Sequence, residues 1–280
     1  MTPLAMEDVL KVIHRLPSLP TVVMELLASM DQDDVDIDTL AGKIAQDQAL
    51  TAKTLRLANS SFYGRAHAVN TMAEAIAILG FRTVRSVVTT AGLMQSMGNS
   101  GGGALDLQPF WRHAIAVAVC ARELAPHLRV NPDHAYTAGL LHDIGRLVLV
   151  TQLAPQYAAV MAYCAQHGCG TLEAERQVLG LDHAEIGQAL TVYWKFPLHL
   201  QRAVGMHHAA DVPDDGALTL VVMAADAIAH ALDLAMDPGD AVPAMIPQLW
   251  SRLAVADKTL LQIFSRVEKQ FVAASQILET

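Results

Sequence analysis

The chain has 280 residues, of which 52% are hydrophobic, and it carries a formal net charge of −9 at pH 7. A chain of this length and composition can bury one large core or two packed lobes, which excludes a disordered protein. The acidic balance argues against a protein that wraps nucleic acid, because nonspecific affinity for that backbone comes from clustered lysine and arginine.

The residue pattern predicts an all-α fold from the first residues onward. Residues 1–16 lack a basic segment followed by an apolar one, so no secretory signal is expected. Apolar residues then recur at three and four positions, and aromatic residues make up only 5% of the chain, which favours helices over strands. In the first third of the chain the helices are expected to be short, because breakers separate them: Pro17 and Pro20 before 21–30, the acidic residues 31–38 before 39–59, and Gly80 after 73–79.

Residues 59–65, Asn-Ser-Ser-Phe-Tyr-Gly-Arg, end a long predicted helix and allow two interpretations. The simpler one is a helix stop with polar caps and a buried aromatic side chain. The alternative is a recognition surface, because aromatic residues and arginine are enriched at interfaces. That surface would comprise Phe62, Tyr63 and Arg65, extended by Arg56, Arg82 and Arg85.

A glycine-rich stretch at residues 98–109 is the sharpest break in the chain. Its glycines disfavour regular structure, and its proline suits the start of a following helix. The sequence therefore predicts two helical lobes, an N-terminal lobe over 1–98 and a second lobe over 109–280, joined by a connection at 99–108. Helices of the second lobe are expected near 109–126, 132–152, 154–168, 171–180, 182–195, 197–208, 218–234 and 257–278.

The final predicted helix has one apolar stripe, with the charged residues off it. We expect it to dock along its length on the second lobe. Its stripe consists of Leu260, Phe264, Val267, Phe271 and Leu278.

The most apolar window, residues 217–236, is interrupted by Asp226, His230 and Asp233, which argues against an ordinary membrane span. The cysteines lie in apolar stretches without CxxC spacing, so we expect core packing and reduced thiols in a cytoplasmic protein. They are Cys120, Cys164 and Cys169.

The central chemical motif is the pair His142-Asp143 in residues 139–146, Gly-Leu-Leu-His-Asp-Ile-Gly-Arg. Neighbouring residues of a helix point about 100° apart, so both side chains could reach one cavity between helices. Gly139 and Gly145 would let neighbouring backbone approach closely. An isolated His-Asp pair is weak evidence, so its interpretation depends on the rest of the second lobe.

That lobe holds further histidines and one acid in apolar surroundings. Asp226 interrupts a nearly uniform apolar helix, where an unpaired carboxylate would be costly to bury. Imidazoles and carboxylates from several helices form the ligand set that Fe, Mn or Zn accepts, and such a metal can activate water for phosphoester hydrolysis. The candidate metal ligands are His113, His142, Asp143, His183, His207, His208 and Asp226. No functional role is assigned to His14, His67, His127, His134, His167, His199 or His230.

The order of these residues resembles the metal-ligand order of HD-type phosphohydrolases, and the chain resembles the HDOD family of that superfamily most closely. The resemblance covers roughly residues 10–235 and is carried by residues 16–30, 44–64, 68–93, 135–149 and 182–197. It implies an all-α fold with an HD-like second lobe. It also implies a role in bacterial signal transduction, often as the output domain of a response regulator.

Many members of the family have no established enzymatic activity, so the resemblance favours a module that binds a signalling protein, such as a receiver domain, a kinase or a transcriptional regulator. A regulatory domain would precede Met1 if the chain is part of a longer protein. The alternative is a metal-dependent phosphohydrolase acting on a nucleotide or cyclic dinucleotide, in which Asp143 and Arg146 would be catalytic. Two features depart from the related HD-GYP phosphodiesterases: residues 207–216 replace the GYP motif, and Arg146 replaces the usual lysine.

Overall fold

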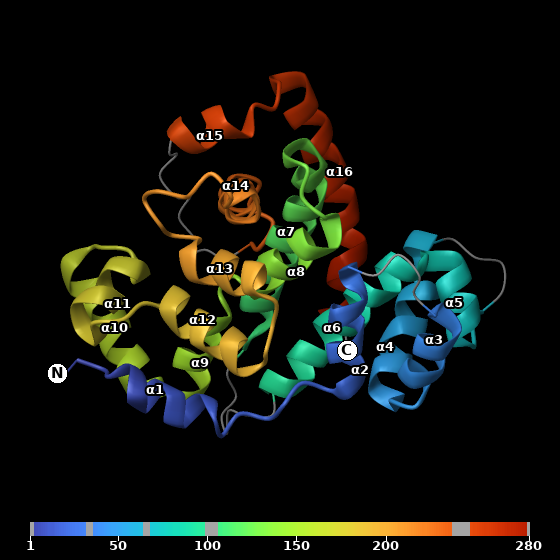
Figure 1. Cartoon of the computed structure of the whole chain (residues 1–280), viewed down its shortest axis with the longest axis horizontal. Coiled ribbons are helices and arrows are strands. Elements are labelled where there is room, and N and C mark those ends of the chain that lie inside the picture. Colours follow the sequence, from blue (N-terminus) through green and yellow to red (C-terminus); the bar gives the residue numbers. More distant parts are fainter. Residues whose placement is uncertain (1–2, 32–35, 64–67, 99–105, 237–246, 279–280) are drawn as a thin grey trace.

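The computed structural model describes residues 3–31, 36–63, 68–98, 106–236 and 247–278. Within these ranges the chain forms helices and short connections and contains no strand, so the predicted all-α fold is confirmed. Figure 1 shows one group of helices around α3, α4 and α5 and a larger group around α7, α8 and α14.

Three helices of the first third of the chain, α3, α4 and α5, begin after a residue whose side chain caps them. Asp47 Oδ1 accepts hydrogen bonds from the backbone N–H groups of Ala49 and Leu50, at 2.9 and 3.0 Å, and thereby divides the expected segment 39–59 into two helices. Gly80, at φ 78°, separates the last two helices of this group. The bounds are α1 (Met6–Ile13), α2 (Thr21–Ala28), η1 (Ser29–Asp31), α3 (Ile37–Ala45), α4 (Gln48–Ala58), η2 (Ser61–Tyr63), α5 (Met72–Leu79) and α6 (Phe81–Gly98).

The helices of the second group follow the predicted order, except that one predicted helix is divided in two and one short helix is additional. The single helix expected over 132–152 is two helices, because the chain turns at His142 and Asp143. A short helix at 247–253 was not predicted, nor was the first helix of the chain. The bounds are α7 (Gln108–Leu124), η3 (Ala125–Leu128), α8 (Pro132–Leu141), α9 (Ile144–Gln152), α10 (Ala154–His167), α11 (Thr171–Leu179), α12 (His183–Tyr193), α13 (Leu198–Met206), α14 (Ala217–Ala231), α15 (Pro247–Leu253), α16 (Asp257–Ser275) and η4 (Gln276–Leu278).

Helices α7 and α8 form the centre of the second group and pack unusually closely. A Cβ atom added to Gly139 of α8 would lie 2.9 Å from the Cα of Ala118 and from the carbonyl oxygen of Val117, both on α7. Only glycine fits so close a backbone approach, as the sequence predicted. Helix α16 packs along α7, where Arg266 and Gln270 both contact the Glu123 carboxylate.

Both ends of the chain reach across the fold. The backbone N–H of Leu4 donates to the Leu179 carbonyl at 2.7 Å, and α1 packs on α12 rather than on the helices that follow it in sequence. At the other end, η4 contacts α4 (Figure 1). Residues 99–105 lie outside the described ranges, so the division into two lobes at 99–108 stays a prediction.

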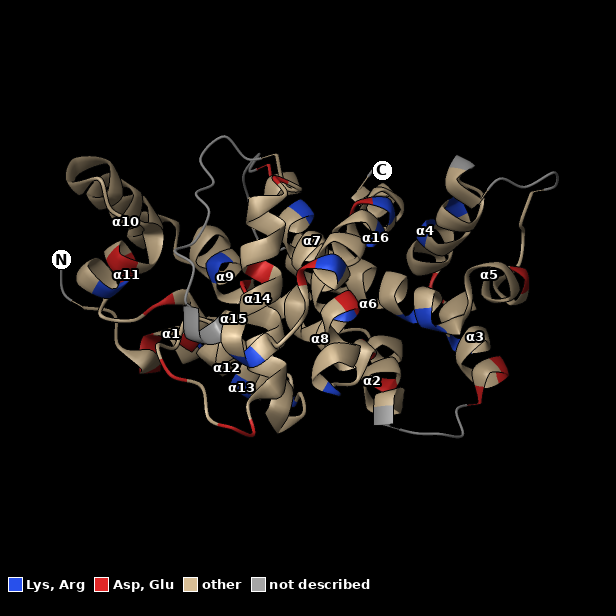
Figure 2. Ribbon diagram, turned by 90° about the horizontal axis from the view of Figure 1, so that it is seen from above, with Lys and Arg blue, Asp and Glu red and all other residues tan. Residues whose placement is uncertain are grey.

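An ion pair links α6 to α8. Arg85 donates to Asp133, and both side chains are less than 10% exposed. Arg85 therefore belongs to the core and not to the surface suggested for residues 59–65. Figure 2 shows basic and acidic residues interspersed along the described helices.

The segment at residues 59–63 combines features of both interpretations. The Asn59 side chain bonds the carbonyls of Leu55 and Val69 and accepts from the Val69 N–H at 2.7 Å, which fixes the helix stop. Phe62, however, is 48% exposed, and Tyr63 is half-buried. Arg65 lies outside the described residues.

No single helix in the described part of the chain combines the length and apolar character that crossing a bilayer requires. Two strongly bent helix pairs would meet those criteria only when each pair is taken together, by length and composition alone. Of the cysteines, Cys120 is buried, whereas Cys164 and Cys169 are half-buried.

Candidate metal centre

The seven predicted ligands converge from three helices and from two segments between helices. His113 lies on α7, the His142-Asp143 pair between α8 and α9, and His183 at the first position of α12. The remaining ligands come from the chain after α13 and from α14: His207, His208 and Asp226.

The turn at His142 and Asp143 aims both side chains inward. His142 follows the last residue of α8, and Asp143 precedes the first residue of α9 with φ −97° and ψ 11°. Gly145 allows this turn, because a Cβ atom there would collide with the His183 carbonyl and the Gly187 N–H on α12. The pair therefore reaches one site through a break between helices, and the expectation of two adjacent positions in one helix is wrong.

One group of ligands surrounds Asp143. Its Oδ1 lies 3.1 Å from Nε2 of His183 and 3.5 Å from Nε2 of His207. The Nε2 atom of His208 lies 3.0 Å from that of His183. Four side chains thus offer ligand atoms that all lie within 4.8 Å of one another.

A second group surrounds Asp226. Its Oδ1 lies 3.2 Å from Nε2 of His113, 3.2 Å from Nε2 of His230 and 3.7 Å from Nε2 of His142. His142 joins this group to Asp143, whose Oδ2 lies 3.7 Å away. The two groups therefore meet at the His142-Asp143 pair.

Hydrogen bonds fix two of the imidazoles with a bare nitrogen facing the site. Nδ1 of His142 donates to the Gly139 carbonyl, and Nδ1 of His207 donates to the Val204 carbonyl, each at 2.7 Å. Because a carbonyl only accepts, Nε2 carries the lone pair in the neutral ring. Burial lowers the pKa of His142 to about 4, so this ring is neutral at pH 7.

Imidazole nitrogens that lie this close to one another and to a carboxylate can share one cation. Nε2 of His113 lies 3.2 Å from Nε2 of His142, and Nε2 of His183 lies 3.3 Å from Nε2 of His207. Asp226 Oδ1 is buried and accepts no well-aligned hydrogen bond despite the imidazoles around it. The residues present thus fit a divalent transition metal, because imidazole nitrogens and carboxylate oxygens are ligands for Fe, Mn and Zn.

The carboxylates are ionised. Burial disfavours the charge of Asp143, yet His142 and Arg146 hold its pKa well below the usual range. Burial also opposes the charge of Asp226, and the nearby His113 and His230 lower its pKa in the same way. For His208, burial lowers the pKa to about 2, so the ring is neutral and its nitrogens can act as ligands.

Arg146, which would be catalytic in a phosphohydrolase, lies at the edge of the cluster. Its Nη1 donates to Asp143 Oδ2 at 2.8 Å, and its side chain is 32% exposed. The guanidinium is thus held by a candidate ligand while part of it faces solvent. In contrast, the side chains of His113, His142, Asp143, His183, His207, Asp226 and His230 expose between 0 and 11% of their surface.

Two residues of the cluster were missed by the sequence interpretation. His230, which was given no role, lies one turn after Asp226 on α14, and this i, i+4 spacing was a usable signal. Glu175 of α11 is fully buried, and its Oε2 accepts from Nδ1 of His183 at 2.6 Å. Glu175 sits among ordinary helix formers, so no pattern in the sequence distinguishes it.

Comparisons with known proteins agree with this architecture. A protein of the HDOD domain family from Geobacter sulfurreducens, of unknown function, superposes with a TM-score of 0.79 over 98% of this chain and 99% of its own, at 23% identity. A candidate phosphohydrolase from Shewanella amazonensis SB2B superposes with a TM-score of 0.75 over 96% of this chain and 97% of its own, at 28% identity.

Curated relatives are longer than this chain. An uncharacterised protein of Treponema pallidum is 24% identical over 201 residues, which are 70% of this chain and 38% of that protein. A ribonuclease Y of Desulfotalea psychrophila is 31% identical over 120 residues, which are 43% of this chain and 18% of that protein. The chain thus spans less than two fifths of the length of either relative. The HDOD domain model matches residues 16–210, and the chain therefore belongs to the HDOD domain family.

Proposed function

We propose that this chain is a metal-binding HDOD module that acts in the bacterial cytoplasm by binding a signalling protein, and that a divalent Fe, Mn or Zn ion sits in the buried cluster. The observation that carries the metal is the convergence of imidazole nitrogens on two ionised carboxylates. The signalling role is what membership of the HDOD family implies.

Burial of the cluster favours a binding module over an enzyme. Apart from the half-buried His208, the predicted ligand side chains expose at most 11% of their surface, so a substrate would find little of the site to touch in this conformation. Asp143, His183 and His207 would hold the ion at one end of the cluster, and His113, His142 and Asp226 at the other. Bound there, a divalent ion supplies Lewis acidity toward an oxygen ligand.

A metal-dependent phosphohydrolase acting on a nucleotide or cyclic dinucleotide is the second candidate. It is favoured by Arg146, because a guanidinium fixed beside the cluster and partly open to solvent can pair with a phosphate. The similarity to the candidate phosphohydrolase of Shewanella amazonensis supports the same function. In this case Asp143 would hold both the ion and the phosphate-binding arginine.

Elemental analysis of protein purified without chelator tests the metal, and a hydrolysis assay of the same protein separates the two functions. We expect near-stoichiometric metal in the wild type, loss of it in the double variant His142→Ala/Asp143→Ala, and full retention in His127→Ala, which removes an exposed histidine. The metal form found is then assayed for hydrolysis of bis(p-nitrophenyl) phosphate. Hydrolysis that disappears in the double variant would establish the second candidate. A metal-free wild type whose stability is unchanged by added Mn or Fe would contradict both.

A further inference from the structure

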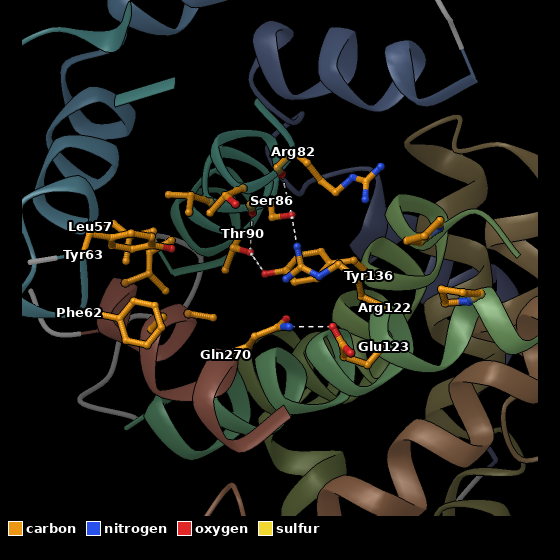
Figure 3. Close-up of a pocket in the computed structure, with 17 residues that line it drawn as sticks. Leu57, Phe62, Tyr63, Arg82, Ser86, Thr90, Arg122, Glu123, Tyr136 and Gln270 are labelled. Atoms are coloured by element: carbon orange, nitrogen blue, oxygen red, sulfur yellow. Dashed lines mark hydrogen bonds between the residues drawn. The ribbon is translucent and has the colours of Figure 1, made fainter. Parts of the chain in front are cut away.

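A cavity of about 390 Å³ lies apart from the metal cluster, where α6, α7, α8 and α16 meet η2 (Figure 3). Its volume falls in the range of sites that hold small organic ligands, roughly 300–1,000 Å³. None of the candidate metal ligands is among the described residues that line it.

One wall of the cavity carries a positive charge that no carboxylate neutralises. The Arg122 guanidinium stacks 4.4 Å above the centre of the Tyr136 ring, and its Nη1 donates to Ser86 Oγ at 3.3 Å. Its Nε is buried and has no hydrogen-bond partner. Among the described residues, no Asp or Glu oxygen lies within 4.0 Å of this guanidinium, and the adjacent Glu123 is taken by Arg266.

An arginine that lines a cavity and has no carboxylate partner can pair there with an anion through its terminal N–H groups. The Arg122 guanidinium is also held in place by its stacking on Tyr136. Binding a planar or tetrahedral oxyanion therefore costs little further side-chain entropy. Arg82 adds a second cation at the rim: its side chain is 62% exposed, and its nearest carboxylate oxygen, on Asp133, lies 3.4 Å away.

The facing wall is aromatic and apolar. Figure 3 shows Phe62 and Tyr63 on the side of the cavity opposite Arg122 and Tyr136. The two rings meet edge to face, with centroids 5.1 Å apart, and Phe62 is 48% exposed although it is a large apolar residue. Between the two walls, the hydroxyls of Thr90 and Tyr136 lie 3.1 Å apart and offer further polar contacts.

We propose that this cavity binds a small organic anion that carries an aromatic ring. The anionic group, a phosphate, phosphonate or carboxylate, pairs with Arg122, and the ring packs against Phe62 and Tyr63. Phe62 and Tyr63 were part of the recognition surface suggested by the sequence for residues 59–65. We propose that what they recognise is a small molecule. The proposal is independent of the metal cluster and of its function.

Phenylphosphonate is the first probe, because it joins a dianion to a ring and its carbon–phosphorus bond resists hydrolysis at a metal site. Isothermal titration calorimetry compares it with its two halves, methylphosphonate and benzyl alcohol, and we expect the whole probe to bind more tightly than either. Arg122→Gln should weaken binding about tenfold or more, the effect of losing a charge-assisted hydrogen bond. Arg15→Gln, which removes an exposed arginine outside the cavity, should leave the affinity unchanged.

A second variant tests the cavity without touching the cation. Ala274→Phe adds a ring from α16 into the space while both arginines remain, so the loss of binding in this variant would assign the probe to the cavity. Circular dichroism first establishes that both variants keep their helix content. The His142→Ala/Asp143→Ala protein should bind the probe like the wild type. The proposal is overturned if the wild type does not bind phenylphosphonate, if Arg122→Gln and Ala274→Phe bind it undiminished, or if the double variant loses it.

Discussion

Glu175 and His183 are joined by two hydrogen bonds that end on one oxygen atom. Glu175 Oε2 accepts from the backbone N–H of His183 at 2.9 Å and from its Nδ1 at 2.6 Å. The ring is thereby fixed with Nε2 toward Asp143 Oδ1, 3.1 Å away. A carboxylate that orients a histidine from behind is the usual support of a metal ligand, because it sets the tautomer and makes the facing nitrogen a better donor to the ion.

Replacing Glu175 should therefore weaken metal binding without removing a ligand. We expect Glu175→Gln to lower the affinity for Mn²⁺ by about 10–100-fold, measured by calorimetric titration of chelator-treated protein. The matched control is Glu173→Gln, an exposed residue on the same helix, which should bind like the wild type. Equal affinities for the two variants would show that Glu175 does not support the site.

Metal binding should become tighter as the pH rises from 7 to 9. In the metal-free protein, burial disfavours the charge on His183, but Asp143 and Glu175 outweigh it and raise the pKa to about 9. A proton held there at pH 7 must leave when the ion binds, so the logarithm of the association constant should rise by about one for each pH unit and level off above the pKa. Titrations with Mn²⁺ in buffers of different protonation enthalpy would count the released protons. A pH-independent affinity over this interval would contradict the prediction.

Two glycine substitutions should change stability in opposite directions. A Cβ atom at Gly145 collides with the backbone of α12 at His183 and Gly187, so Gly145→Ala should lower the free energy of unfolding by about 1–3 kcal/mol and reduce metal content. Gly42 lies in α3, and a Cβ atom there meets nothing within 4 Å. Gly42→Ala should therefore raise the free energy of unfolding by about 0.5–1 kcal/mol. Urea denaturation measures the free energy of unfolding of both variants. Equal destabilisation of the two would show that the close approach of Gly145 to α12 does not account for the effect.

The buried ion pair between α6 and α8 should be costly to break from one side. Arg85→Met leaves the buried Asp133 paired only with the exposed Arg82, so we expect a loss of about 3–5 kcal/mol in the free energy of unfolding. Arg82→Met is the control, because this exposed arginine faces the same carboxylate and should contribute less than about 1 kcal/mol. The double variant Arg85→Met/Asp133→Leu should recover part of the loss. No recovery would mean that packing rather than charge accounts for the effect.

The helices could be predicted largely because their signals are local. The apolar stripe of the last helix gives Val267 and Phe271 as buried residues, and both are buried in the structure. The turn at His142 and Asp143 could not be predicted, because the residues on either side continue a helical pattern. Close to this turn the chain contacts a distant segment, because Gly145 approaches the backbone of α12.

Part of the candidate site could also be predicted, because its ligands stand out from their local sequence. Histidines beside apolar helices identify residues that need a partner, so the ligand candidates from His113 to Asp226 could be named from the sequence. Which atoms meet depends on how helices are rotated about their axes, and one sequence does not fix this. His230 was overlooked although its i, i+4 spacing places it on the same face of α14 as Asp226. Glu175 could not be found in this way, because its burial depends on the placement of α11.

Helices α7 and α8 each serve two sites at once. Helix α7 carries His113 of the metal cluster and Arg122 of the cavity, and α8 carries Tyr136 and ends beside His142. Gly139 brings the backbones of these two helices into direct contact, so one pair of helices positions groups in both sites. Thermodynamic coupling is reciprocal, so an anion in the cavity that alters the affinity for the metal would have its own affinity altered by the metal by the same factor. Measuring anion affinity with and without the ion would read out this coupling directly.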